Sequence, residues 1–180
     1  LHWNYSIEAL QLILPVGLSF HTFQAMAYTI EVYRGQQKAE RHLGIYALYI
    51  MFFPQLVAGP IERPQNMLHQ FRQNHPLDVG RWASGLRWML WGLFKKVAVA
   101  DLVAPVVRSV FGSGDAGTPL QFDGPVLAVA TVFFAIQIYC DFSGYSDIAI
   151  GVARLLGYDL MTNFRQPYFS RSIGEFWRRW

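Results

Sequence analysis

Residues 138–180 read IYCDFSGYSDIAIGVARLLGYDLMTNFRQPYFSRSIGEFWRRW, and they set a polar cluster directly against an apolar run that ends at Cys140. Acid and hydroxyl groups beside a membrane-like run are costly unless they are satisfied or used. The candidate catalytic residues, as groups that line or orient a site, are therefore Asp141, Ser143, Tyr145 and Asp147.

The composition of the 180 residues is typical of a membrane protein. Only 15% are charged, against about 25% in an average soluble domain, while 53% are hydrophobic and 16% are aromatic. Aromatic residues are plentiful enough to form belts at both membrane interfaces. A soluble all-α protein with a large core would also be apolar, but it would carry more surface charge. We predict an all-α, multi-pass integral membrane helical bundle whose surroundings are the lipid bilayer.

Charge and cysteine content exclude several other classes. The net charge is +3, but the Lys and Arg residues are spread between apolar runs and form no tract, so we expect no nucleic-acid partner. Cys140 is the single cysteine, which excludes an intrachain disulfide and a cysteine-based metal site. The five histidines show no metal-ligand spacing, and no metal is expected. The chain begins without Met and ends on Trp180, which predicts one partial domain, residues 1–180, of a larger protein.

Three uncharged runs are candidate membrane elements. Residues 9–30 are long enough for a span at about 1.5 Å per residue, and residues 124–140 are a plausible span if Leu120 and Phe122 contribute at one end. Residues 44–61 contain Pro54 and Pro60, which remove backbone donors and favour a broken or re-entrant element.

Residues 82–111 are apolar but carry Lys95 and Lys96 near the middle. Two lysines facing lipid would cost several kcal/mol. We predict either two elements that meet near Lys95 or a helix at the interface whose lysines reach outward. Residues 148–156 are expected to form a short helix that ends at Gly157.

The polar cluster has two interpretations on residue types alone. Ser143 is a possible nucleophile without a base nearby in sequence, and Asp141 or Asp147 is a possible partner for a histidine base held elsewhere. Alternatively, these groups cap a helix that begins near Ser146, and capping is slightly favoured. Nucleotide loops, zinc-protease and hydrolase motifs are absent from the sequence.

Two other sets of side chains are ambiguous. His21 lies inside the first apolar run, where it either bonds to a neighbouring helix or, less favoured, lines a polar cavity. Arg178 and Arg179, with Trp177 and Trp180, form either an interfacial anchor or a site for acidic or acyl-carrying ligands.

Six stretches together resemble the membrane-bound O-acyltransferase family, in particular its bacterial branch for alginate O-acetylation, and they occur in family order almost from end to end. They are LPVGLSFHTFQ at 14–24, VYRG at 32–35, FFPQLVAGPIER at 52–63, DFSGYSD at 141–147, NFRQPY at 163–168 and EFWRRW at 175–180.

The resemblance implies a helical membrane bundle with a funnel or tunnel through a thin centre, in the bacterial inner membrane. It implies transfer of an acyl group, most often acetyl, from a cytoplasmic thioester such as acetyl-CoA toward hydroxyls of an exported polysaccharide such as alginate. Periplasmic acetyltransferase partner proteins are implied as well. The cluster at 141–147 would then line the site, and the substrate-binding candidates would be Asn163, Arg178, Arg179 and His21.

One departure from the family pattern matters. In this branch an essential histidine directly follows the motif EFWRRW, so the resemblance places it just past Trp180. We therefore expect residues 1–180 to carry part of the site wall and to be inactive by themselves. Two alternatives stay open: a transporter or channel whose broken spans line a substrate path, and a non-catalytic membrane scaffold of a polysaccharide-modification complex.

Overall fold

The computed structural model describes residues 18–56, 59–112 and 122–180, and every regular element in these ranges is helical. This confirms the all-α prediction for the described chain. The elements in order are α1 (Leu18–Tyr33), α2 (Leu43–Ile50), η1 (Phe53–Gln55), α3 (Pro64–Met67), η2 (Gln70–Arg72), α4 (Val79–Leu93), η3 (Phe94–Ala100), α5 (Asp101–Phe111), α6 (Gly124–Leu155), η4 (Pro167–Phe169) and α7 (Ile173–Arg179).

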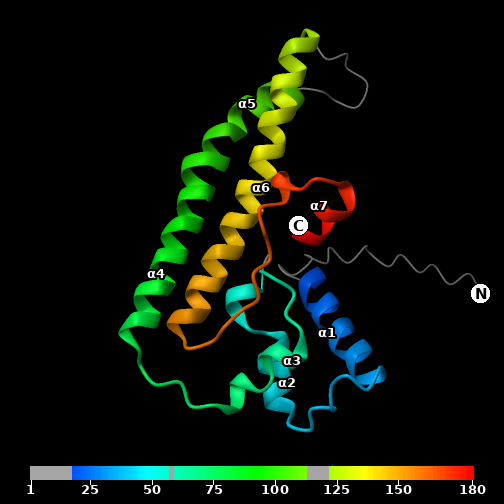
Figure 1. The fold of residues 1–180 in the computed structure, drawn as a ribbon, viewed down its shortest axis with the longest axis vertical. Coiled ribbons are helices and arrows are strands. Elements are labelled where there is room, and N and C mark those ends of the chain that lie inside the picture. Colours follow the sequence, from blue (N-terminus) through cyan, green and yellow to red (C-terminus); the bar gives the residue numbers. More distant parts are fainter. Residues whose placement is uncertain (1–17, 57–58, 113–121) are drawn as a thin grey trace, which may run out of the picture.

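A long helical pair dominates the molecule (Figure 1). α4, η3 and α5 follow one another without a break, and α6 runs back along all three. η3 is a π-helical segment, the form that often marks a functional position inside a helix. The predicted junction near Lys95 is therefore a change of helix type, and the chain does not turn there.

Recognisable sequence signals mark the start and the end of α6. Pro125 stands in the first turn, where its missing N–H costs nothing. At the other end, Gly157 adopts φ +94°, its N–H donates to the Arg154 carbonyl, and the Tyr158 N–H donates to the Ala153 carbonyl. This is the Schellman arrangement, which requires the left-handed conformation that glycine adopts most easily.

α6 has 32 residues, a length of about 48 Å at 1.5 Å per residue. Among the described residues it is the one helix that is long and apolar enough to cross a bilayer, judged by length and composition. The multi-pass bundle therefore remains a prediction, and residues 9–17 of the first proposed span lie outside the described residues.

The expectations for residues 124–156 need correction. The predicted span at 124–140 and the predicted short helix at 148–156 are parts of one continuous α6. The capping interpretation is wrong because Ser143 and Ser146 lie in the middle of this helix. Backbone N–H groups there already donate to carbonyls one turn earlier, so no free helix end exists for them to cap.

Glycines let α4 and α6 approach closely. A Cβ atom on Gly92 would lie 2.4 Å from the Gly144 carbonyl oxygen, and one on Gly151 would lie 2.6 Å from the Gly85 carbonyl oxygen. The two glycines on each helix are about two turns apart, so the two contacts lie on one face of each helix. The backbones therefore meet directly along the middle of the pair.

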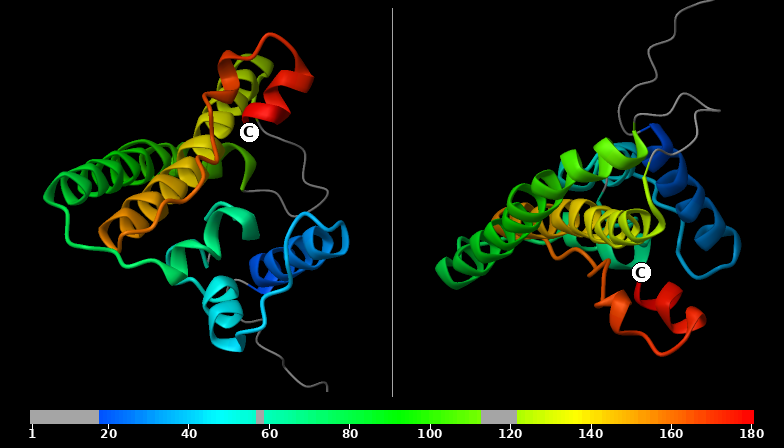
Figure 2. Two further views of the ribbon diagram at one scale, coloured as in Figure 1. Left: turned by 60° about the horizontal axis from the view of Figure 1, so that its bottom comes forward. Right: turned by 90° about the horizontal axis from the view of Figure 1, so that it is seen from above.

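A smaller layer packs beside the C-terminal half of α6 (Figure 2). α2 ends at Ile50, and η1 begins directly before Pro54, so the chain breaks where this proline predicted. The core residues joining this layer to α6 are Tyr49, Phe52, Met67, Leu68, Ala149, Ile150, Ala153 and Leu160.

We predict that Gly144→Ala lowers the stability of the full-length protein in detergent by about 1–3 kcal/mol, because the new Cβ would lie 2.8 Å from the Gly92 carbonyl oxygen. Thermal unfolding measures the loss. Gly124→Ala on the same helix is the matched control, since nothing lies within 4 Å of its Cβ position. Equal stability of the two variants would contradict direct backbone contact.

Candidate functional site

Lys95 is the centre of a buried polar network between η3 and α6. Its Nζ lies 2.6 Å from Oδ2 of Asp147 and donates a 3.0 Å hydrogen bond to Oγ of Ser143. The Tyr139 ring centroid is 5.9 Å from the ammonium. Ser143 is fully buried, and both charged partners are largely shielded from solvent. A charge-assisted network of this kind is strong because little water competes for it.

Lys96 forms a second, more exposed network on the neighbouring side of the pair. Its Nζ lies 2.7 Å from Oδ1 of Asp141 and 3.0 Å from Oδ1 of Asp101. Both lysines thus pair with carboxylates. The carboxylates on α6 therefore offset the free-energy cost that is expected for two lysines in an apolar helix. The predicted cluster is divided between the two networks, with Asp141 in one and Ser143 and Asp147 in the other.

An aromatic cage holds the C-terminal helix against α6. Trp180 contacts four rings, with centroid separations of 5.2 Å to Phe164, 5.4 Å to Phe176 and 6.3 Å to both Tyr139 and Tyr168. The Tyr168 hydroxyl donates to the Ala135 carbonyl at 2.7 Å. Because Tyr139 belongs to both the cage and the Lys95 network, α7 is anchored next to the buried polar groups.

The other predicted residues lie at different distances from this network. Asn163 contacts α6 at the residue before Asp147, since its Nδ2 donates to Oγ of Ser146 at 3.3 Å. Arg179 is paired with Glu175 at 2.6 Å, and Arg178 is exposed on α7. Tyr145 is partly buried on α6.

His21 belongs to a separate small cavity of about 10 Å³, which Gln24 and Gln55 also line. Its Nε2 is buried and has no hydrogen-bond partner within the described chain, and the same is true of the Gln55 Oε1. This favours the cavity interpretation over a bond to a neighbouring helix. The space is enough for about one water molecule.

Glu62 is a buried acid that the sequence did not single out. Its side chain is fully buried, and it accepts hydrogen bonds from Asn66 Nδ2 at 2.8 Å and from the Met161 backbone N–H. The Tyr49 hydroxyl donates to the Glu62 carbonyl at 2.6 Å. Burial raises the pKa of the Glu62 carboxyl above its usual range, although both hydrogen bonds oppose this shift. Glu62 thus fixes the segment that carries Asn163.

The sequence matches the membrane-bound O-acyltransferase family over residues 42–180. The chain belongs to this family. It is similar to a protein named probable alginate O-acetylase AlgI from Azotobacter vinelandii, with 42% identity over 94% of this chain and 32% of the relative. The chain thus spans about a third of the length of such relatives.

Two further relatives of this membrane-bound O-acyltransferase chain act on other polymers, by their names. A peptidoglycan O-acetyltransferase from Helicobacter pylori is 36% identical over 99% of this chain and 38% of the relative. A teichoic acid D-alanyltransferase from Streptococcus thermophilus is 28% identical over 92% of this chain and 40% of the relative. Transfer of a small acyl group to a cell-surface polymer is common to these names.

Sequence reasoning singled out the acid and the hydroxyl of the Lys95 network but not its lysine. Asp147 and Ser143 were predicted, whereas Lys95 was considered only as a costly charge. The sequence signal for this pair is that one apolar segment carries a lysine and a neighbouring apolar segment carries an aspartate. Buried charges in membranes are usually paired, so this signal would have joined Lys95 to Asp147. Within the described residues no group of His, Cys, Asp and Glu side chains has metal-site geometry.

We predict that Lys95→Met destabilises the full-length protein by about 3–5 kcal/mol, because Asp147 is left as an unpaired buried charge. Lys95→Met combined with Asp147→Leu should recover most of that loss, since an apolar pair leaves no charge behind. A double-mutant cycle of thermal unfolding in detergent measures the coupling. Lys96→Met, in the exposed network, is the matched control and should cost about 0–1 kcal/mol. Additive losses in the cycle would refute the pairing.

Glu62→Gln should remove a pH-dependent contribution to stability. The raised pKa means that the native state holds the Glu62 proton more tightly than the unfolded chain does. The protonated Glu62 carboxyl therefore contributes to the free energy of unfolding of the wild type at pH values below the ordinary glutamate pKa. This contribution is lost as pH rises through the folded-state pKa. The stability advantage of wild type over Glu62→Gln should shrink as the pH rises above the ordinary glutamate pKa.

Glu40→Gln is the control of opposite sign for this measurement. Hydrogen bonding to Arg72 lowers the pKa of Glu40, with a closest N–O separation of 2.7 Å. Its contribution is present above the ordinary glutamate pKa and is lost as pH falls through the folded pKa. Urea unfolding at several pH values measures the stability difference between wild type and each variant. This difference should change with pH in opposite directions for the two variants. A change in the same direction would show that Glu62 is not desolvated.

Proposed function

We propose that this chain is part of a membrane enzyme that moves an acyl group, acetyl in the simplest case, from a cytoplasmic thioester such as acetyl-CoA toward hydroxyls of an exported polysaccharide such as alginate. The enzyme would lie in the bacterial inner membrane as a multi-pass protein and would work with periplasmic acetyltransferase proteins. Family membership and the names of the relatives support the acyl-transfer chemistry.

The observation that carries the proposal is the Lys95 network inside a helix of membrane-spanning length. Ser143 and Asp147 of α6 contact one ammonium from η3, and the Tyr139 ring of the same helix lies 5.9 Å from it. Polar groups held in this way inside an apolar helix pair mark functional positions in membrane proteins. The cluster also lies in one of the stretches that resemble the family.

The aromatic cage provides the link to a catalytic base. The resemblance places a histidine directly after Trp180, and the cage holds Trp180 beside Tyr139. Tyr139 is one helical turn from Ser143, so a side chain that follows Trp180 would lie near the Lys95 network. In this proposal Ser143 and Asp147 orient the site, and Asn163, Arg178 and Arg179 contact substrate.

The transfer step itself is simple in atoms and charge. A hydroxyl oxygen attacks the thioester carbonyl carbon, the carbon–sulfur bond breaks, and the base passes the hydroxyl proton to the departing thiolate. Groups already fixed in a desolvated site stabilise the developing charge without having to reorganise.

In the full-length protein, we expect Ser143→Ala and Asp147→Asn each to lower polymer acetylation at least about tenfold, equivalent to about 1.4 kcal/mol in the barrier. Acetyl content of the exported polymer measures the effect. Thr131→Val is the control on α6, because this hydroxyl only donates to the Leu127 carbonyl of its own helix. Unchanged acetylation in both site variants would sink the proposal, and polymer or solute flux without any acyl transfer would support the transporter.

A further inference from the structure

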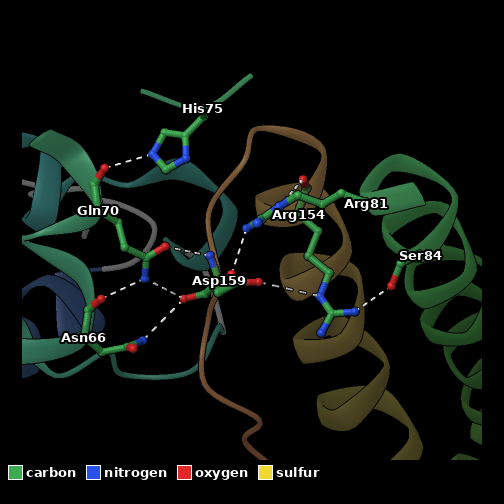
Figure 3. A network of polar contacts seen from close by, with 7 residues as sticks. All are labelled: Asn66, Gln70, His75, Arg81, Ser84, Arg154 and Asp159. Atoms are coloured by element: carbon green, nitrogen blue, oxygen red, sulfur yellow. Dashed lines mark hydrogen bonds and ion pairs between the residues drawn. The ribbon is translucent and has the colours of Figure 1, made fainter. Parts of the chain in front are cut away.

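A polar pocket of about 250 Å³ lies at the end of the helical pair where α4 begins and α6 ends. Figure 3 shows its centre, Asp159, between amide side chains from the loop on one side and two arginines on the other. The residues used below as the Asp159 pocket are Asn66, Gln70, Gln73, His75, Arg81 and Asp159.

Hydrogen bonds to the main chain of Asp159 make this pocket rigid. Gln70 Nε2 donates to the Asp159 carbonyl at 3.0 Å, and the Asp159 N–H donates to Gln70 Oε1 at 2.8 Å. Asn66 Nδ2 donates to the same carbonyl at 3.3 Å. His75 is fixed as well, because its Nε2 bonds to the Gln70 carbonyl at 2.8 Å and its ring packs 4.5 Å from that of Tyr158. A preorganised pocket loses little entropy when it binds a ligand.

The charge of the pocket favours an anion. Asp159 is the one carboxylate among the lining residues, and two guanidinium groups face it, that of Arg81 in the lining at 2.9 Å and that of Arg154 behind it, outside the lining, at 4.0 Å. The Arg81 Nε donates to the Arg154 carbonyl, and the Arg154 Nη1 donates to Ser84 Oγ at 2.6 Å, so both arginines are held in place. One positive charge is therefore left over. A cation would meet this excess charge, whereas a phosphate would be attracted by it.

The distribution of basic residues favours a cytoplasmic position for this end of the pair. By sequence, residues 112–123, which join α5 to α6, contain two aspartates and no Lys or Arg. The opposite end carries many basic residues, and cytoplasmic segments of membrane proteins are enriched in these. They are Arg34, Lys38, Arg41, Arg63, Arg72, Arg81 and Arg154.

We infer that the Asp159 pocket is a cytoplasmic binding site for a phosphate group, separate from the Lys95 network. Arg81 provides the charge, and the side-chain amide of Gln73 at the exposed rim provides further hydrogen-bond donors. The phosphate belongs either to an anionic lipid headgroup or to a soluble phosphate compound. Basic pockets between membrane helices on the cytoplasmic side are suited to both. The inference does not rest on acyl transfer, because binding is measured without it.

The test uses thermal unfolding of the full-length protein in lipid nanodiscs. One arm adds inorganic pyrophosphate to phosphatidylcholine nanodiscs, and the other replaces part of the phosphatidylcholine by phosphatidylglycerol. We expect Tm to rise by about 2 °C or more in at least one arm. A rise with pyrophosphate indicates a soluble phosphate, and a rise with phosphatidylglycerol alone indicates a lipid headgroup.

Three variants tie the effect to the pocket. Gln73→Glu adds a negative charge at the exposed rim and should weaken apparent binding at least about fivefold without disturbing the fold. Arg81→Gln removes the main cation and should do the same, although it also breaks the ion pair with Asp159. Arg87→Gln makes the same charge change at an exposed position on α4 outside the pocket and should bind as wild type does. No Tm rise in either arm, or an equal rise in Gln73→Glu and wild type, would overturn the inference.

Discussion

The contact between Lys95 and Asp147 depends on how closely α4 and α6 approach. Gly92 and Gly144 remove the side chains that would hold the backbones apart, so neither lipid nor water has room between the helices at that level. In such a dry contact the attraction between two charges is strong, but so is the cost of leaving either one alone. The glycines and the ion pair therefore act together, because the first creates the environment in which the second fixes the register of the two helices.

Because α6 is continuous, this contact organises both ends of the molecule. Toward the N-terminus of α6, Tyr139 belongs to both the Lys95 network and the aromatic cage, and it thereby positions α7 relative to the network. Toward its C-terminus, Arg154 and the turn at Gly157 set the Asp159 pocket against the start of α4. A continuous helix of this length holds the Lys95 network and the Asp159 pocket at a fixed separation.

Much of the site could be predicted from sequence, and much of its geometry could not. The polar cluster was visible because acids and hydroxyls are rare in apolar runs. The continuity of α6 was not, because Gly144 and Ser146 resemble the residues that end helices, whereas in the structure Gly144 packs against α4 and Ser146 bonds to Asn163 inside the helix. Lys95 was missed as a partner for Asp147 because they are far apart in sequence. The spacing that Gly85 and Gly92 share with Gly144 and Gly151 is a sequence signal that would have joined the two segments.

The two adjacent lysines also explain why one pair is buried and the other exposed. Neighbouring residues on a helix differ in direction by about 100°, and Asp141 and Asp147 on α6 differ by about 120°. If Lys95 faces the α6 backbone, Lys96 must point to the rim of the pair, where Asp141 is within reach. Exchanging the roles of the two lysines would leave a buried aspartate without a partner. The order of charges along both helices therefore permits one register, and the π-helical segment lies at the point where that register is set.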